Sequence, residues 1–248
     1  MKTQFYIIVF LLSVFASFAQ NSVGGKRGVG NYVGGVDFND FSTKSGYNVT
    51  QILGKFDDSS NGVETNGKKT EGSSLLFEGW DNKGTIVLGD KNYRIKNLNY
   101  DIKKDQFLTR INQDSIFVFD FNNIDKIILN DRIFKQIYDT KLNATKIYEV
   151  IFEDENLSLL KNYSVNIIAG SPDPMLNRPN DKIKQNSSYF LYKNKLMEPF
   201  KWNKKSILGL VDEVNKDEFE TYFKKNNLSY KDESDVSKVL KYFSKVDL

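Results

Sequence analysis

The sequence predicts an α+β protein that is mainly antiparallel β. We expect a meander of about eight to ten strands, arranged as an open barrel or a sandwich, followed by two or three C-terminal amphipathic helices. From residue 71 to residue 200, short apolar runs alternate with turns rich in Gly, Asn and Asp. Beyond residue 204, apolar residues recur with the helical period instead of the strand period.

The apolar runs are predicted to pair into hairpins, because the residues between them favour tight turns. The expected pairs are Thr85–Leu88 with Tyr93–Ile95, Leu98–Ile102 with Phe107–Ile111, Tyr148–Phe152 with Leu157–Leu160, and Tyr189–Tyr192 with Leu196–Phe200. Connections this short predict antiparallel pairing, since parallel strands need longer crossovers. Ser171–Ser187 holds three of the four prolines and is interpreted as a long loop.

One strand is expected to be central. In Ser115–Phe121, Phe117, Phe119 and Phe121 alternate with Ile116 and Val118, so both faces are largely apolar. A strand that is apolar on both faces is typical of the middle of a sheet or of a closed barrel. The three phenylalanines are therefore predicted core residues.

The C-terminal segment is predicted to be helical. Asn215 and Glu218 have the spacing of a capping box, and a second periodic run can be capped by Asp232, Ser234 or Asp235. The apolar positions that recur at helical spacing are Ile207, Leu208 and Val211, then Phe219, Tyr222 and Phe223, then Val236, Val239, Leu240 and Phe243. We expect these helices to pack on the sheet or on one another.

The chain is predicted to be exported. Lys2 precedes the apolar run Phe5–Phe15, and Ala16-Ser17-Phe18-Ala19 offers small residues before a cleavage point at Gln20. These features are typical of a secretory signal peptide. The expected organisation is a signal peptide over 1–19, a flexible Gly/Asn/Ser-rich lead over 20–74, an antiparallel β domain over 75–202 and a helical segment over 203–248.

Localisation follows from this organisation. With no cysteine for lipid attachment, the mature protein is expected to be periplasmic or extracellular, with no membrane span after signal cleavage.

Composition limits the chemistry. The chain has no cysteine and no histidine, which excludes thiol nucleophiles, thiolate metal sites and the commonest general base. Charge is nearly balanced, with 35 basic and 32 acidic residues, and a concentrated basic face for nucleic acid is not expected. No cofactor and no catalytic or metal-ligating residue is predicted.

Two motif-like patterns in the lead are interpreted as linker. Gly28-Val29-Gly30 has no flanking strand or helix pattern, as a phosphate loop would require. Asp57–Gly62 matches the first half of a calcium loop, but Lys68 stands where a bidentate Glu is needed.

The candidate ligand-binding residues are Trp80, Glu78 and Asp81. An indole can form a platform for a sugar ring, and two neighbouring carboxylates can bind hydroxyl groups or act as a hydrolytic pair. The alternative interpretation is that the acidic residues are simply solvated in a turn.

Several segments resemble a widespread family of exported bacteroidete proteins. The residues that carry the likeness are Glu71-Gly72-Ser73-Ser74 with Trp80 and Gly84–Leu88, then Tyr148–Phe152 with Leu159-Leu160-Lys161, then Lys204–Leu208 and Phe223–Ser229. The resemblance implies export across a bacterial inner membrane, and it implies no activity or site residue.

Two functional hypotheses follow. The first is an exported non-catalytic β-rich protein of the bacterial envelope, a binding, interaction or structural module whose partner is an envelope protein or a glycan. The alternative is a carboxylate-dependent hydrolase acting on glycans.

Overall fold

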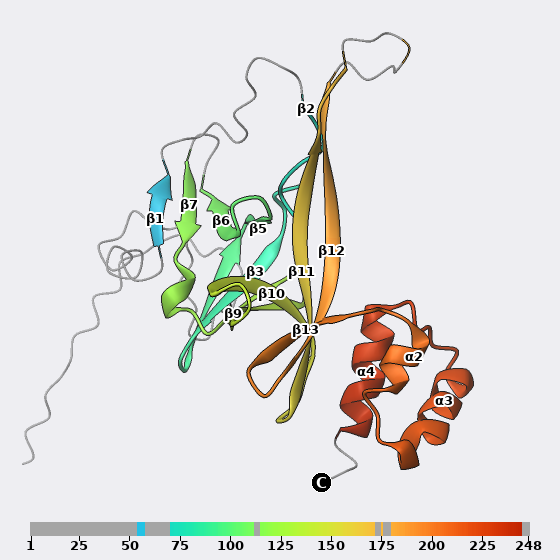
Figure 1. Ribbon diagram of the computed structural model, residues 1–248. Coiled ribbons are helices and arrows are strands. Elements are labelled where there is room, and N and C mark those ends of the chain that lie inside the picture. The colour runs from blue at the N-terminus through green and yellow to red at the C-terminus, as the bar shows by residue number, and fades with distance from the viewer. Residues whose placement is uncertain (1–53, 58–69, 112–114, 172–174, 176–179, 245–248) are drawn as a thin grey trace, which may run out of the picture. The chain divides into compact units, whose positions relative to one another are not determined.

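The computed structural model describes residues 54–57, 70–111, 115–171, 175 and 180–244, and all of these belong to one compact unit (Figure 1). The predicted signal peptide and most of the Gly-rich lead lie outside the described residues. Within the described part of the chain, no helix combines the length and the hydrophobicity needed to span a membrane.

The smaller sheet has four antiparallel strands in the order β1-β7-β6-β5. Its strands are β1 (Gly54–Asp57), β5 (Leu98–Asp101), β6 (Gln106–Arg110) and β7 (Ile116–Phe119). β7 lies between two neighbours, and its Phe117, Val118 and Phe119 are buried. The prediction of a central strand here is confirmed.

The larger sheet has nine strands. Eight follow the order β13-β12-β11-β10-β9-β8-β3-β4, and β2 pairs with β12. Its strands are β2 (Thr70–Glu71), β3 (Lys83–Leu88), β4 (Lys91–Lys96), β8 (Lys126–Leu129), β9 (Arg132–Asp139), β10 (Ala144–Glu153), β11 (Leu157–Ile168), β12 (Asp181–Lys193) and β13 (Leu196–Phe200). Figure 1 shows β11 and β12 as two long neighbouring strands. Among the described strands only the β2–β12 pairing is parallel, so the predicted fold class is confirmed.

The C-terminal segment is helical, as predicted. It contains α2 (Lys204–Leu208), a 3-10 turn (Glu213–Asn215), α3 (Lys216–Lys225) and α4 (Glu233–Phe243), and a further 3-10 turn (Phe121–Asn123) follows β7. The carboxylate of Asp232 caps α4 by accepting hydrogen bonds from the backbone N–H groups of Ser234 and Asp235. The expected capping box does not form, because the Asn215 side chain makes no cap hydrogen bond to α3.

Besides a small cluster of Tyr148, Leu160 and Met197, two hydrophobic cores contact the larger sheet. In the first core, Phe107 and Phe117 of the smaller sheet pack with Ile127 and Phe134 of the larger one. The second core joins β10 and β11 to the helices. Its buried members are Ile151, Phe152, Leu159, Ile207, Phe219, Phe223, Val236, Val239, Leu240 and Phe243.

α4 is attached to the sheet at an irregularity in β10. The register with β11 shifts between Val150 and Phe152, which leaves Ile151 unpaired in a β-bulge. The Ile151 carbonyl instead accepts a hydrogen bond of 2.5 Å from the hydroxyl of Ser237 in α4.

Three predictions about the chain need correction. The loop expected over Ser171–Ser187 ends early, because β12 begins at Asp181 and pairs along its length with β11. β9 was not expected, since polar residues interrupt its apolar ones, but it pairs with β8 and β10. The lead over 20–74 also contributes β1 and β2, because short segments with few apolar residues can still pair with an existing sheet edge.

Candidate functional site

A row of polar residues crosses the larger sheet on the face that carries both cores. Glu149 of β10 stands opposite Lys161 of β11, and Lys161 stands opposite Tyr189 of β12. Two residues beyond Lys161 in β11, Tyr163 packs against the first core. Two residues before Lys161, Leu159 belongs to the second core. The polar row therefore separates two apolar regions of one sheet face.

Glu149 is the most buried carboxylate of this row. It is 5% exposed. Its Oε2 accepts a short hydrogen bond from the hydroxyl of Tyr163 and lies 3.8 Å from the Arg132 guanidinium. Arg132 also donates a hydrogen bond of 3.0 Å to the Tyr163 hydroxyl, which closes a triangle of three side chains.

Lys161 connects the sheet to α4. Its Nζ donates to both carboxylate oxygens of Glu233 at 2.8 and 3.0 Å, and the Lys161 side chain is only 11% exposed. The Tyr189 hydroxyl donates a short hydrogen bond to the same carboxylate. We call Arg132, Glu149, Lys161, Tyr163, Tyr189 and Glu233 together the polar belt.

Burial dominates the electrostatics of the belt. It raises the pKa of Glu149 above its usual value of 4.5, while the hydrogen bond from Tyr163 and the charge of Arg132 lower it in part. The pKa of Tyr163 is raised by burial and by the Glu149 charge, and that of Tyr189 by burial and by Glu233. Both tyrosines consequently stay neutral hydrogen-bond donors across the physiological pH range.

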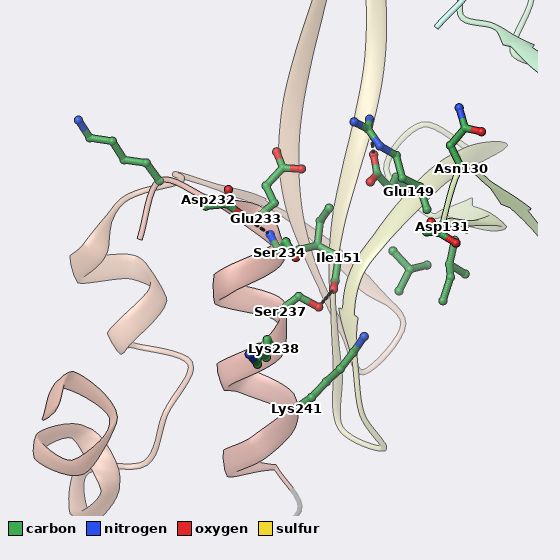
Figure 2. A pocket seen from close by; sticks show the side chains of 14 residues that line it. Asn130, Asp131, Glu149, Ile151, Asp232, Glu233, Ser234, Ser237, Lys238 and Lys241 are labelled. Carbon is green, nitrogen blue, oxygen red and sulfur yellow. Dashed lines mark hydrogen bonds and ion pairs between the residues drawn. The ribbon is translucent and has the colours of Figure 1, made fainter. Parts of the chain in front are cut away.

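A groove of about 780 Å³ lies beside the belt. Figure 2 shows it between α4 and the strands, with Glu149 and Asn130 on the sheet side. Ser234, Lys238 and Lys241 line it from the helix side. This volume is in the range of sites for small molecules.

The sheet side of the groove is shaped by a tight turn. Asn130 and Asp131 join β8 to β9 and have φ values of 47° and 65°. Two consecutive residues with positive φ form a type I′ turn, which Asn and Asp tolerate better than most residues. The turn brings both side chains to the groove immediately before Arg132 of the belt.

The helix side of the groove is one stripe of α4. Ser234, Lys238 and Lys241 recur at helical spacing and are exposed. The opposite stripe, with Val236 and Leu240, is buried in the second core. The same helix therefore stabilises the fold on one face and lines the groove on the other.

This arrangement is suited to binding. Buried Glu149 and half-buried Glu233 already interact with cations and tyrosines of the belt, so their oxygens are held in fixed positions. A hydrolytic carboxylate pair needs one acid to protonate the leaving group and the other to act as nucleophile or base. Glu149 has the raised pKa expected of such an acid, but Glu233 accepts three hydrogen bonds from Lys161 and Tyr189.

The predicted site residues lie in a different part of the fold. Glu78 and Asp81 are exposed and Trp80 is half-buried. The Arg110 guanidinium lies 4.5 Å from the centre of the Trp80 ring, a cation–π contact. None of these three predicted residues lines the groove, and their role as ligand-binding residues stays a prediction.

The loop that holds Trp80 is fixed by a buried asparagine. The Asn99 side-chain amide donates to the carbonyls of Phe77 and Gly79 at 2.8 and 3.0 Å. Its oxygen accepts from the backbone N–H of Phe77. This loop therefore has a defined conformation even though its acidic residues are solvated.

One feature of the sequence points to the polar belt. Glu149 interrupts the apolar run Ile147–Phe152, and Lys161 follows Leu159 and Leu160 in the next strand. A charge inside a buried strand is rare unless it is paired. Opposite charges in two strands of one predicted hairpin would have indicated a cross-strand ion pair.

In the part of the chain that the structure describes, no group of three or more acidic side chains is placed to hold a metal ion. Comparison with protein-family models, with curated proteins and with solved structures gave no match for this chain.

Proposed function

We propose that the protein is an exported, non-catalytic binding module of the bacterial envelope. In this proposal the groove beside the polar belt binds a glycan. The observation that supports it is the groove of about 780 Å³ lined by fixed polar and charged side chains. Sugar hydroxyls are recognised by hydrogen-bonding groups held in place before the ligand arrives, because less ordering entropy is lost on binding.

Export is part of the proposal. The basic residue, apolar run and small-residue exit of residues 1–19 support a cleaved signal peptide, and the periplasm or the cell exterior would then supply the ligand. Mass spectrometry of the protein recovered from its native host would show a chain beginning at Gln20. A chain that retains Met1 to Ala19 would contradict this part of the proposal.

The binding experiment uses soluble fragments of cell-envelope glycans, titrated calorimetrically into the mature protein. Ser234 is exposed on the groove side of α4, so Ser234→Trp places a large ring in the groove without disturbing the buried stripe. We expect this variant to lose binding. The matched control is Lys225→Trp, an exposed position of α3 that does not line the groove, and it should bind as the wild type does. Unchanged binding by Ser234→Trp would contradict the proposed site.

A hydrolase is the second candidate, supported by one observation. Glu149 has a raised pKa and shares a network with the carboxylate of Glu233, as acid and partner do in glycosidases. The same glycan fragments, incubated with wild type and with Glu149→Gln, distinguish the two functions. Release of reducing ends by the wild type that Glu149→Gln abolishes would establish the hydrolase and overturn the binding proposal.

A further inference from the structure

We propose that the ligand of the groove is an acidic oligosaccharide, and that Lys238 and Lys241 of α4 bind its anionic groups. This inference rests on the proposed function and narrows its ligand to one chemical class. The observation that supports it is a set of charged side chains on the groove wall that take no part in the ion pairs within the protein.

The charges of the polar belt are already balanced. Arg132 lies against Glu149, and Lys161 is paired with Glu233. The carboxylate of Asp232 caps α4 through neutral backbone N–H groups, so it keeps its negative charge. The four groups of the two ion pairs have no free charge to offer a ligand.

The remaining charges of the groove are mostly positive. They are Lys231, Lys238 and Lys241 against the carboxylates of Asp131 and Asp232. Among the described residues, none of the three lysine side chains has an acidic partner within ion-pair distance. An excess of unpaired cations on one wall of a groove attracts anions, and the concave shape strengthens that field.

The geometry of α4 directs two of these lysines at the same space. Lys238 and Lys241 are three residues apart, so they lie on one face of the helix. Figure 2 shows Lys241 extending from α4 toward the strands across the groove. Two ammonium groups on one helical face suit a chain that carries a negative charge on successive sugars.

Neutral polar groups of the groove would then bind the uncharged part of the ligand. The Asn130 amide at the opposite wall accepts from the Lys83 N–H and donates to Asn82, which leaves one N–H and one lone pair for hydroxyl groups. The hydroxyl of Ser234 adds a further donor on the helix wall. The groove thus combines cations for acidic groups with neutral polar groups for sugar hydroxyls.

The test compares two hexasaccharides of equal length, a hexamer of galacturonic acid and a neutral hexamer of glucose, by titration calorimetry with the mature protein. We expect the acidic hexamer alone to bind. Lys238→Gln and Lys241→Gln should each weaken its binding by about tenfold, because each removes one charge-assisted hydrogen bond. Lys225→Gln, on an exposed position of α3 outside the groove, should leave the affinity unchanged.

The salt dependence and the nature of the anion provide a second readout. Raising sodium chloride from about 0.05 M to about 0.5 M should weaken wild-type binding, and less so in the double lysine variant, since screening acts only on charges that contribute. Inorganic phosphate should compete only weakly, because it carries no sugar hydroxyls for the opposite wall.

Each contrary outcome has a distinct meaning. If the neutral hexamer binds as tightly and Ser234→Trp abolishes its binding, the acidic-ligand inference is wrong and the binding groove stands. If the acidic hexamer binds equally well to Ser234→Trp, the groove is not the site and both proposals are wrong. Full affinity of the double lysine variant, or no binding of the acidic hexamer, also overturns the inference.

Discussion

At the scale of single residues, Glu149 is a carboxylate in an unfavourable place. A carboxylate that is 5% exposed loses most of its hydration. Tyr163, Arg132 and Lys161 surround it and restore part of that loss. Its pKa is nevertheless raised, so the stabilising groups do not fully offset the burial.

The raised pKa of Glu149 gives a prediction about stability and pH. A group whose pKa is higher in the folded state favours folding at low pH, and this advantage is lost as pH rises through the folded pKa. The free energy of unfolding of the wild type, relative to Glu149→Gln, should therefore fall as pH is raised from about 4.5 upward. Urea unfolding of both proteins between about pH 4 and pH 8 measures this difference.

Glutamine is a suitable replacement, because its side-chain oxygen can still accept the hydrogen bond from Tyr163 and it does not titrate. A difference between the two proteins that stays constant over this pH range, or that grows with pH, would show that burial of Glu149 does not control its protonation.

At the scale of elements, the turns follow from local residue choice. The β12–β13 connection is Asn194-Lys195, with φ values of 52° and 63°. Asn is well suited to this left-handed conformation, whereas Lys is not, since its Cβ approaches the following carbonyl. The hairpin is stable despite this strain because β12 and β13 pair over five residues.

Replacing the strained residue should stabilise the protein. Lys195→Gly creates the Asn-Gly pair preferred in type I′ turns and should raise the free energy of unfolding by about 0.5–1 kcal/mol. Thermal and urea unfolding would measure the gain.

The neighbouring Lys193→Gly is the matched control. It lies at the end of β12, where glycine only adds freedom to the unfolded chain, and it should lower stability by a similar amount. If both substitutions change stability in the same direction, the positive φ of Lys195 carries no cost.

At the scale of the whole molecule, the helices and the larger sheet share one core. Ile151 and Leu159 of the strands are buried against Phe219 and Val236 of the helices. The bond from Ser237 to the Ile151 carbonyl and the pair of Lys161 with Glu233 add polar attachments between the same parts. Separating the helices from the larger sheet would therefore expose apolar surface to water.

This shared core predicts a single unfolding transition. Trp202 contacts Tyr189 of β12 and donates a hydrogen bond to the Tyr230 carbonyl, so its fluorescence reports on the junction. In Trp80→Phe it is the remaining tryptophan. Its unfolding midpoint in urea should coincide with that of the far-ultraviolet circular dichroism, which reports on the helices and the strands together. Two separated midpoints would show that the helical segment unfolds independently.

Local patterns were sufficient for most of the fold. The hairpins around Gly89, Asp105 and Asn194 were predicted because turn chemistry acts over a few residues. The buried stripe of α4 followed from helical spacing alone. β9 and the start of β12 were missed because pairing with neighbouring strands, and not their own composition, makes them strands.

The candidate groove could not be predicted in the same way. Sequence reasoning selects Trp80, Glu78 and Asp81 because they are neighbours in the chain. The residues of the polar belt, in contrast, come from four strands and one helix. Lys161 and Glu233 are 72 residues apart. Their meeting depends on where α4 docks, which depends in turn on the β-bulge at Ile151.

The sequence by itself therefore determined the class of the fold, the central strand with Phe117 and Phe119, and the helices that end the chain, because hydrophobic spacing and turn residues are local properties. Only the tertiary structure decided that there are two sheets, that α4 packs on β10, and that buried charges form a belt beside a groove. Those outcomes depend on strand register and on contacts between distant segments, for which a single sequence contains no period or motif.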